Sequence, residues 1–136
     1  MAHISITVPG EPVAKGRPRM TKGGHVYTPA KTVRYEKQIR DCWKAQSGEK
    51  LDGPISAIIV AYYKIPKSAK KPVQKDMAAG IIRPTKRPDI DNVVKTLDAL
   101  NGHAFDDDSQ IVEIRAEKRY SENPRVVIDL ANFLYS

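Results

Sequence analysis

The spacing of apolar residues predicts two β-strands in the first half of the chain. Residues 3–9 alternate Ile4, Ile6 and Val8 with polar side chains, which is the period of a strand buried on one face. Residues 55–64 are apolar at both odd and even positions, so both faces of a strand there would be apolar. This is typical of a strand in the middle of a sheet. We therefore expect residues 55–64 to form a central strand that is covered on both faces.

Two further strands are expected later in the sequence. Residues 111–120 alternate apolar with charged side chains, and residues 126–130 are an apolar run. The residues between them, Ser121 to Pro124, are typical of a turn. The pattern therefore predicts that these two strands pair with each other as a hairpin.

Helical signals separate the strands. A hydroxyl residue followed by proline predicts a helix over residues 29–46, and residues 68–79 are expected to form a shorter one. A third helix is expected over residues 89–100, because its apolar residues recur on one side. The order of elements predicts a single α/β domain of the α+β type over residues 1–136, with a small mixed sheet of about four strands packed by two or three helices.

The charge balance adds a functional indication to the predicted fold, because an excess of positive charge favours a negatively charged partner. Lys and Arg number 23 against 16 Asp and Glu, which gives a formal net charge of +7. A basic surface favours a polyanion, although charge that serves solubility alone is the alternative. Cys42 is the single cysteine, so an internal disulfide and a multi-cysteine zinc site are excluded. Because no apolar run reaches about 18 residues and no charged-then-apolar N-terminus is present, we expect a cytoplasmic protein with no membrane association. No organic cofactor is expected.

Much of the positive charge lies in two segments punctuated by Gly and Pro. Such segments suit contact with a phosphodiester backbone, and a solvated surface loop is the alternative interpretation. The second segment leads directly into a group of carboxylates. The residues expected to bind DNA are Lys15, Arg17, Arg19, Lys22, Lys86 and Arg87.

Carboxylates gather between residues 87 and 110. Asp89 and Asp91 begin the predicted third helix, Lys95 follows one turn later, and three consecutive acids, residues 106–108, come after its end. If the turn after the helix brings Asp108 back beside Asp89, mutual repulsion would be relieved by a divalent cation such as Mg²⁺. Lys95 could then orient a water molecule or stabilise charge on a phosphate.

Each acid also has a simpler interpretation. Asp89 could be a helix N-cap, Asp91 and Lys95 could form an ordinary ion pair, and residues 106–108 could be a solvated turn. An EF-hand is excluded, because Val94 stands where that loop requires Gly.

Several short motifs together resemble the RusA family of Holliday junction resolvases. The motifs are Lys15-Gly-Arg-Pro-Arg19, Tyr27-Thr-Pro29, Arg87-Pro-Asp-Ile-Asp-Asn92 followed by Lys95, Leu97-Asp-Ala-Leu-Asn-Gly102 and Asp107-Asp-Ser-Gln-Ile111. The resemblance implies a homodimeric endodeoxyribonuclease that cuts four-way DNA junctions with Mg²⁺, or with Mn²⁺ in its place, and that is often encoded by prophages. It assigns catalysis to Asp89, Asp91, Lys95 and Asp108, and metal binding to Asp89, Asp91, Asp108 and Asp107.

A symmetric dimer also has a physical basis, since resolving a junction requires two cuts and the chain carries one candidate site. Two other functions stay open at this point. The chain could be a nucleic-acid-binding module without catalysis, or a nuclease for other branched DNA or for RNA.

Overall fold

Four strands form one mixed sheet in the computed structural model, which describes residues 2–133. The strands lie in the order β1-β6-β4-β5, and their bounds are β1 (His3–Pro9), β4 (Ile55–Lys64), β5 (Ile111–Ser121) and β6 (Arg125–Asn132). β6 runs antiparallel to both β1 and β4, whereas β4 and β5 are parallel. The expected α+β fold with a mixed sheet is confirmed.

The predicted hairpin between the last two strands is wrong. The turn after β5 reverses the chain, but β4 lies between β5 and β6 and pairs with both. β4 is the most apolar of the strands, so placing it at the edge of the sheet would cost the most free energy. β5 carries charged side chains, which are typical of an edge strand. The central position expected for β4 is confirmed.

One face of the sheet forms the core, and the other face is open. Alternate residues of β1, β4 and β6 are buried, Ile6, Ile59 and Ile128 among them at 0% exposure. The residues between them are at least partly exposed, and Ile58 of β4 is 40% exposed. The expectation that β4 is covered on both faces is therefore wrong, because the helices pack on one side only.

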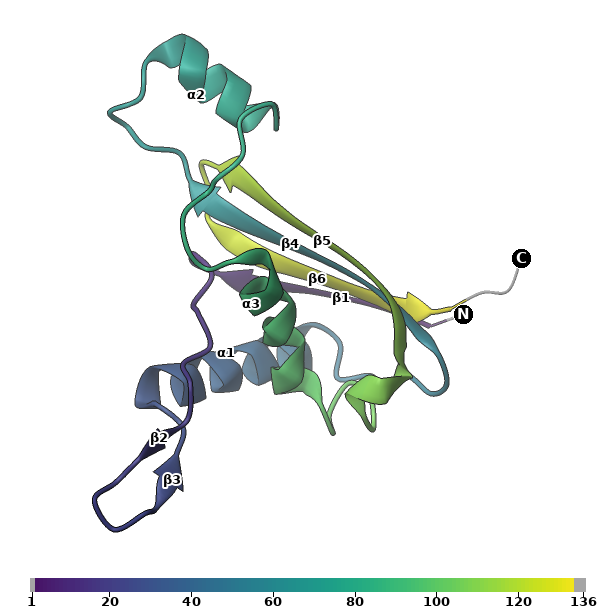
Figure 1. The fold of residues 1–136 in the computed structure, drawn as a ribbon. Helices are drawn as coiled ribbons and strands as arrows, with labels where there is room; N and C mark the ends of the chain where they lie inside the picture. The colour runs from purple at the N-terminus through teal and green to yellow at the C-terminus, as the bar shows by residue number, and fades with distance from the viewer. Residues whose placement is uncertain (1, 134–136) are drawn as a thin grey trace.

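The predicted helices are present, with one difference. The bounds are α1 (Ala30–Gln46), α2 (Lys71–Ala78) and α3 (Ile90–Val94), and α3 continues as a 3₁₀ helix, η1 (Lys95–Leu100). The third helix is thus tighter in its second half than its 3.6-residue pattern suggested. Figure 1 shows α1 and α3 on the same side of the sheet, with α2 beyond the ends of β4 and β5. Among the residues described, no helix is long and apolar enough to cross a membrane.

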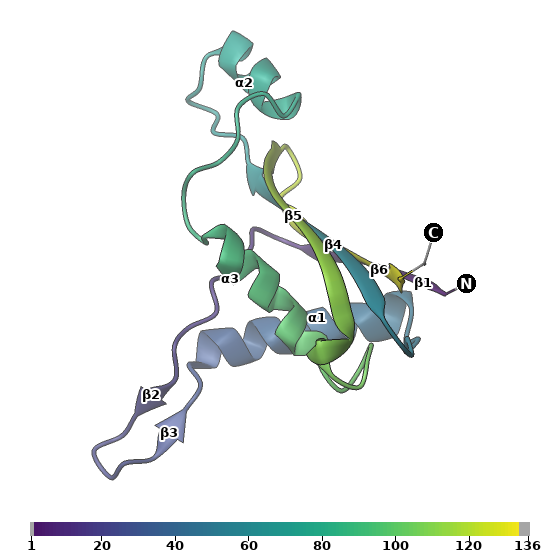
Figure 2. The same ribbon diagram turned by 45° about the vertical axis from the view of Figure 1, so that its right-hand side comes forward.

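A small hairpin projects from the domain before α1. It consists of β2 (Arg19–Met20) and β3 (Val26–Tyr27), joined by a turn in which Gly24 N–H donates to the Thr21 carbonyl at 3.0 Å. Gly24 has a φ of +81°, a conformation that favours glycine, so the sequence supports this turn. Figure 2 shows the hairpin extending away from the sheet.

Candidate functional site

Two hydrogen bonds from side chains of the sheet hold the segment that leads into α3. The buried Tyr63 of β4 donates its hydroxyl to the Pro88 carbonyl at 3.0 Å. Lys118 of β5 donates its ammonium to the Lys86 carbonyl at 2.6 Å. These two hydrogen bonds determine where Asp89 begins the helix.

Asp89 and Asp91 border an open cavity of about 350 Å³ together with Lys95, Arg87 and Arg17. Asp89 occupies the N-cap position of α3, but its side chain accepts no capping hydrogen bond. Among the described residues, neither Asp89 nor Asp91 forms an ion pair, so the expected alternative of an Asp91–Lys95 pair is not seen. Both carboxylates are therefore available to an external cation.

The acidic turn before β5 is held in place by Gln110. Its side-chain oxygen accepts from the backbone N–H groups of Asp106, at 2.8 Å, and Asp107, at 3.0 Å. Its amide nitrogen donates to the carbonyls of Leu51, at 3.2 Å, and Gly53, at 3.0 Å. One side chain thus ties this turn to the segment that precedes β4.

The three acids of this turn differ in their surroundings. Asp106 forms an ion pair with Lys50. Asp107 caps a short 3₁₀ helix, η2 (Asp108–Gln110), by accepting from Ser109 N–H at 3.2 Å. Hydrogen bonding from the Ser109 side chain, and secondly from its backbone, lowers the pKa of Asp107. Asp108 makes no ion pair among the described residues. Of the three, Asp108 is the acid left free.

Lys95 connects the two acidic regions. It lines the cavity of Asp89 and Asp91, and it also lines a neighbouring cavity of about 180 Å³ together with Asp108, Asp98 and Ile114. Within residues 2–133 there is nevertheless no group of three or more acidic, His or Cys side chains close enough to hold a metal ion. The close approach of Asp108 to Asp89 that was expected is therefore not seen as one cluster.

A magnesium ion does not require such a cluster. It is usually bound through one or two carboxylates, with water and phosphate oxygens completing the octahedron. Asp89 and Asp91 are two hard oxygen donors at one open cavity, and neither forms an ion pair with any residue that the structure describes. This donor set fits Mg²⁺ or Mn²⁺, while Asp107 and Asp108 stay predictions as further ligands.

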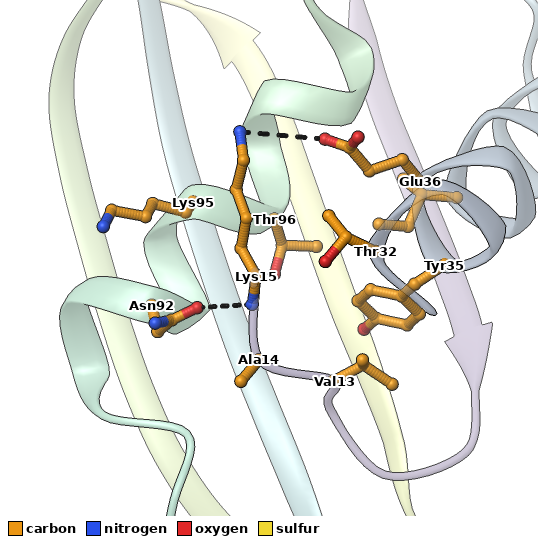
Figure 3. Close-up of a pocket in the computed structure, with 10 residues that line it drawn as sticks. Val13, Ala14, Lys15, Thr32, Tyr35, Glu36, Asn92, Lys95 and Thr96 are labelled. Carbon is orange, nitrogen blue, oxygen red and sulfur yellow. Dashed lines mark hydrogen bonds and ion pairs between the residues drawn. The ribbon is translucent and has the colours of Figure 1, made fainter. Parts of the chain in front are cut away.

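Lys15 is partly engaged within the protein. Its ammonium lies 2.9 Å from Asp98 and 3.9 Å from Glu36, and the hydrogen bond with Asp98 raises its pKa. Its backbone N–H donates to the Asn92 side chain at 2.7 Å, 77 residues further along the chain. Figure 3 shows the contacts of Lys15 with Glu36 and Asn92, and the Lys95 side chain pointing away from Glu36.

The other expected DNA-binding residues are more exposed. Arg17, Arg19 and Lys22 form no ion pair among the residues described. Lys86 lies 3.4 Å from Glu11 and 5.4 Å from the ring centre of Tyr63, so part of its charge is balanced. Arg17 and Arg87 line the acidic cavity, which brings cations from both basic segments to Asp89 and Asp91.

Sequence reasoning missed three residues that position this site. Tyr63, Asn92 and Gln110 each connect segments far apart in the sequence through a hydrogen bond to a backbone group. The only available signal was that Asn92 and Gln110 stand inside the quoted motifs. Glycine is required at position 16 for steric reasons, because a Cβ atom there would lie 2.8 Å from the Pro29 ring.

An α+β domain that presents carboxylates and a lysine beside a basic hairpin fits the class of nucleic-acid hydrolases. Residues 9–131 match the family described as Endodeoxyribonuclease RusA, and the chain belongs to the RusA family. It is also similar to YqaN, an uncharacterized protein of Bacillus subtilis (strain 168). The two are 42% identical over 135 residues, an alignment that covers 94% of this chain and 95% of YqaN.

Proposed function

We propose that the chain is a Mg²⁺-dependent endodeoxyribonuclease that resolves four-way DNA junctions by paired phosphodiester hydrolysis in recombination and repair. The observation that carries the proposal is that Asp89 and Asp91, neither of them in an ion pair among the described residues, line one open cavity together with Lys95. Both carboxylates could therefore bind an external cation. Membership of the RusA family supports the same reaction.

The acidic residues and Lys95 would have different roles in the reaction. Asp89 and Asp91 would hold the metal, with Asp108 and Asp107 as further proposed ligands. When bound, Mg²⁺ would polarise an oxygen of the scissile phosphate. Lys95 is the cation next to both acidic cavities, so its ammonium is suited to stabilise negative charge that develops on the phosphate.

The DNA backbone would be bound mainly by the projecting hairpin and by the segment before α3. Arg19 and Lys22 carry exposed charge on the hairpin, and Arg17, just before it, lines the cavity together with Arg87. Lys15 and Lys86 would contribute through the part of their charge that is not balanced internally. Because phosphate contacts position the duplex, these cations would place one phosphate at Asp89 and Asp91.

A homodimer completes the proposal. Resolution of a four-way junction needs two cuts in opposing strands, and one chain supplies one site. A two-fold axis would present a second, identical site to the second strand.

The test is a panel of labelled substrates: four-way junction, flap, duplex, single strand and RNA, each with and without Mg²⁺. Purified wild-type protein should cut the junction in the presence of Mg²⁺, and Asp89→Asn should bind it without cutting. Asp106→Asn is the matched control, because it removes one carboxylate from the acidic turn but should leave cleavage intact. Binding without metal-dependent cleavage of any substrate would instead identify a non-catalytic module, and preferential cleavage of flaps or RNA would overturn the junction assignment.

A further inference from the structure

The projecting hairpin exposes an apolar face. Met20 of β2 lies directly opposite Val26 of β3, and residues that oppose each other across two antiparallel strands have their side chains on the same face. Met20 is 69% exposed and Val26 is 58% exposed, so neither side chain packs into the core. Figure 1 and Figure 2 both show the hairpin extending away from the sheet, which leaves this face open to solvent.

The surroundings of this apolar face are strongly basic. On the other face of the hairpin, Arg19 lies opposite Tyr27, and Lys22 in the turn is also exposed. Residues 12–35 contain six Lys or Arg and no Asp or Glu. Such a charge distribution favours a polyanion, and it disfavours contact with another copy of the same basic segment.

A phosphodiester backbone accounts for the cations of the hairpin but not for Met20 and Val26. Phosphate groups are polar, and bases that are paired and stacked present only their edges in the grooves. An unpaired base also presents the apolar face of its ring, and burying that face against an apolar side chain is favourable. Exposed Met and Val between cations therefore fit DNA that contains an unpaired base better than continuous duplex.

We propose that the Met20–Val26 face of the hairpin binds an unpaired nucleobase at a branch point in DNA. Arg19 and Lys22 bind the phosphates next to that base. The inference rests on the proposed function for its substrate, DNA. It adds the feature by which the hairpin distinguishes branched DNA from continuous duplex.

The start of the hairpin is held at the candidate site. Lys15 donates its backbone N–H to the Asn92 side chain of α3 at 2.7 Å, and Gly16 donates its backbone N–H to the Thr32 hydroxyl of α1 at 2.8 Å. Arg17, two residues before β2, lines the acidic cavity. The hairpin therefore begins at the cavity that would receive the scissile phosphate.

The test compares two end-labelled duplexes, one fully paired and one that carries a single unpaired 2-aminopurine, with EDTA present so that no metal ion is bound. By fluorescence anisotropy, wild-type protein should prefer the bulged duplex by about tenfold. The emission of 2-aminopurine should rise, because the base leaves the stack. The double variant Met20→Thr, Val26→Thr keeps strand-forming residues, and it should lose both the preference and the rise in emission.

Two controls separate the apolar contact from general effects. Ile81→Thr with Val112→Thr changes two apolar side chains that are 72% and 56% exposed elsewhere on the chain, and it should retain the preference. Lys22→Ala removes a phosphate contact, so it should weaken binding to both duplexes by a similar factor and also retain the preference. Thermal unfolding should show every variant folded.

Three results would overturn the inference: equal binding of both duplexes by wild-type protein, an unchanged preference in Met20→Thr, Val26→Thr, or an equal loss of preference in the Ile81→Thr, Val112→Thr control. None of these measurements depends on cleavage. A chain that shows the preference but cuts no DNA with Mg²⁺ would therefore keep this inference and contradict the proposed function. A chain that cuts junctions but shows no preference would do the reverse.

Discussion

Gln110 shows how one uncharged residue can determine the position of a reactive carboxylate. Its amide group makes four hydrogen bonds, two accepted from the acidic turn and two donated to the segment before β4. Gln110→Ala removes all of them, so we expect the free energy of unfolding to fall by about 1–2 kcal/mol and junction cleavage to fall more steeply. Gln110→Glu keeps the acceptor and loses the donor, and should lie between Ala and wild type.

These effects can be measured by urea unfolding and by single-turnover cleavage. If Gln110→Ala lowers stability but cleaves at the wild-type rate, Asp108 does not depend on this turn for its position. Its role as a metal ligand would then lose support.

Tyr63 connects the core to the site and introduces a pH dependence. Burial, reinforced by the charges of Glu11 and Asp89, raises the pKa of Tyr63 to about 12, and burial raises that of Tyr35 to about 12. In the unfolded chain tyrosine ionises near about 10. Above that pH the unfolded state releases protons that the folded state retains, so stability should decline between about pH 10 and 12.

We expect Tyr63→Phe to flatten this decline, because one of the two buried hydroxyls is removed. At neutral pH the same variant leaves the Pro88 carbonyl without its donor, which should destabilise the fold by about 1–3 kcal/mol. Urea midpoints measured from pH 7 to 11 test both effects. An identical alkaline slope in Tyr63→Phe and wild type would contradict the assignment of the titration to this residue.

At the scale of elements, the projecting hairpin gives a prediction about DNA binding. Removing the charge of the hairpin and of the residue just before it by Arg17→Ala, Arg19→Ala and Lys22→Ala eliminates up to three phosphate contacts. Each contact contributes about 0.9 to the slope of log K against log salt. The triple variant should therefore bind the junction more weakly and with a shallower salt dependence. The matched control is Lys37→Ala, Arg40→Ala and Lys44→Ala on α1, which removes equal charge from another surface and should leave the slope unchanged.

Elements also differ in how far the sequence could predict them. The alternation of apolar and polar residues sufficed for β1, and the hydroxyl residue followed by proline located the start of α1. The pairing of β5 with β4 was not predictable from the local turn at residues 121–124. Strand order depends on which strand buries the most apolar surface when it lies between two others, and this is a property of the whole sheet. The carboxylates of the candidate site were identified from their types and spacing, but their separation into two cavities depends on tertiary packing around Lys95.

At the scale of the whole molecule, the proposed dimer predicts that inactivating one of its two sites leaves one strand of the junction uncut. Heterodimers of wild-type chain with Asp89→Asn, isolated through two different tags, would carry one working site on a two-fold scaffold. On a supercoiled plasmid with an extruded cruciform, the wild-type dimer should give linear product, because both opposing strands are cut while the protein stays bound. The heterodimer should give nicked circles, and heterodimers with Asp106→Asn should give linear product as the wild type does. Linear product from the Asp89→Asn heterodimer at the wild-type rate would mean that one site makes both cuts, and the physical reason for a symmetric dimer would be lost.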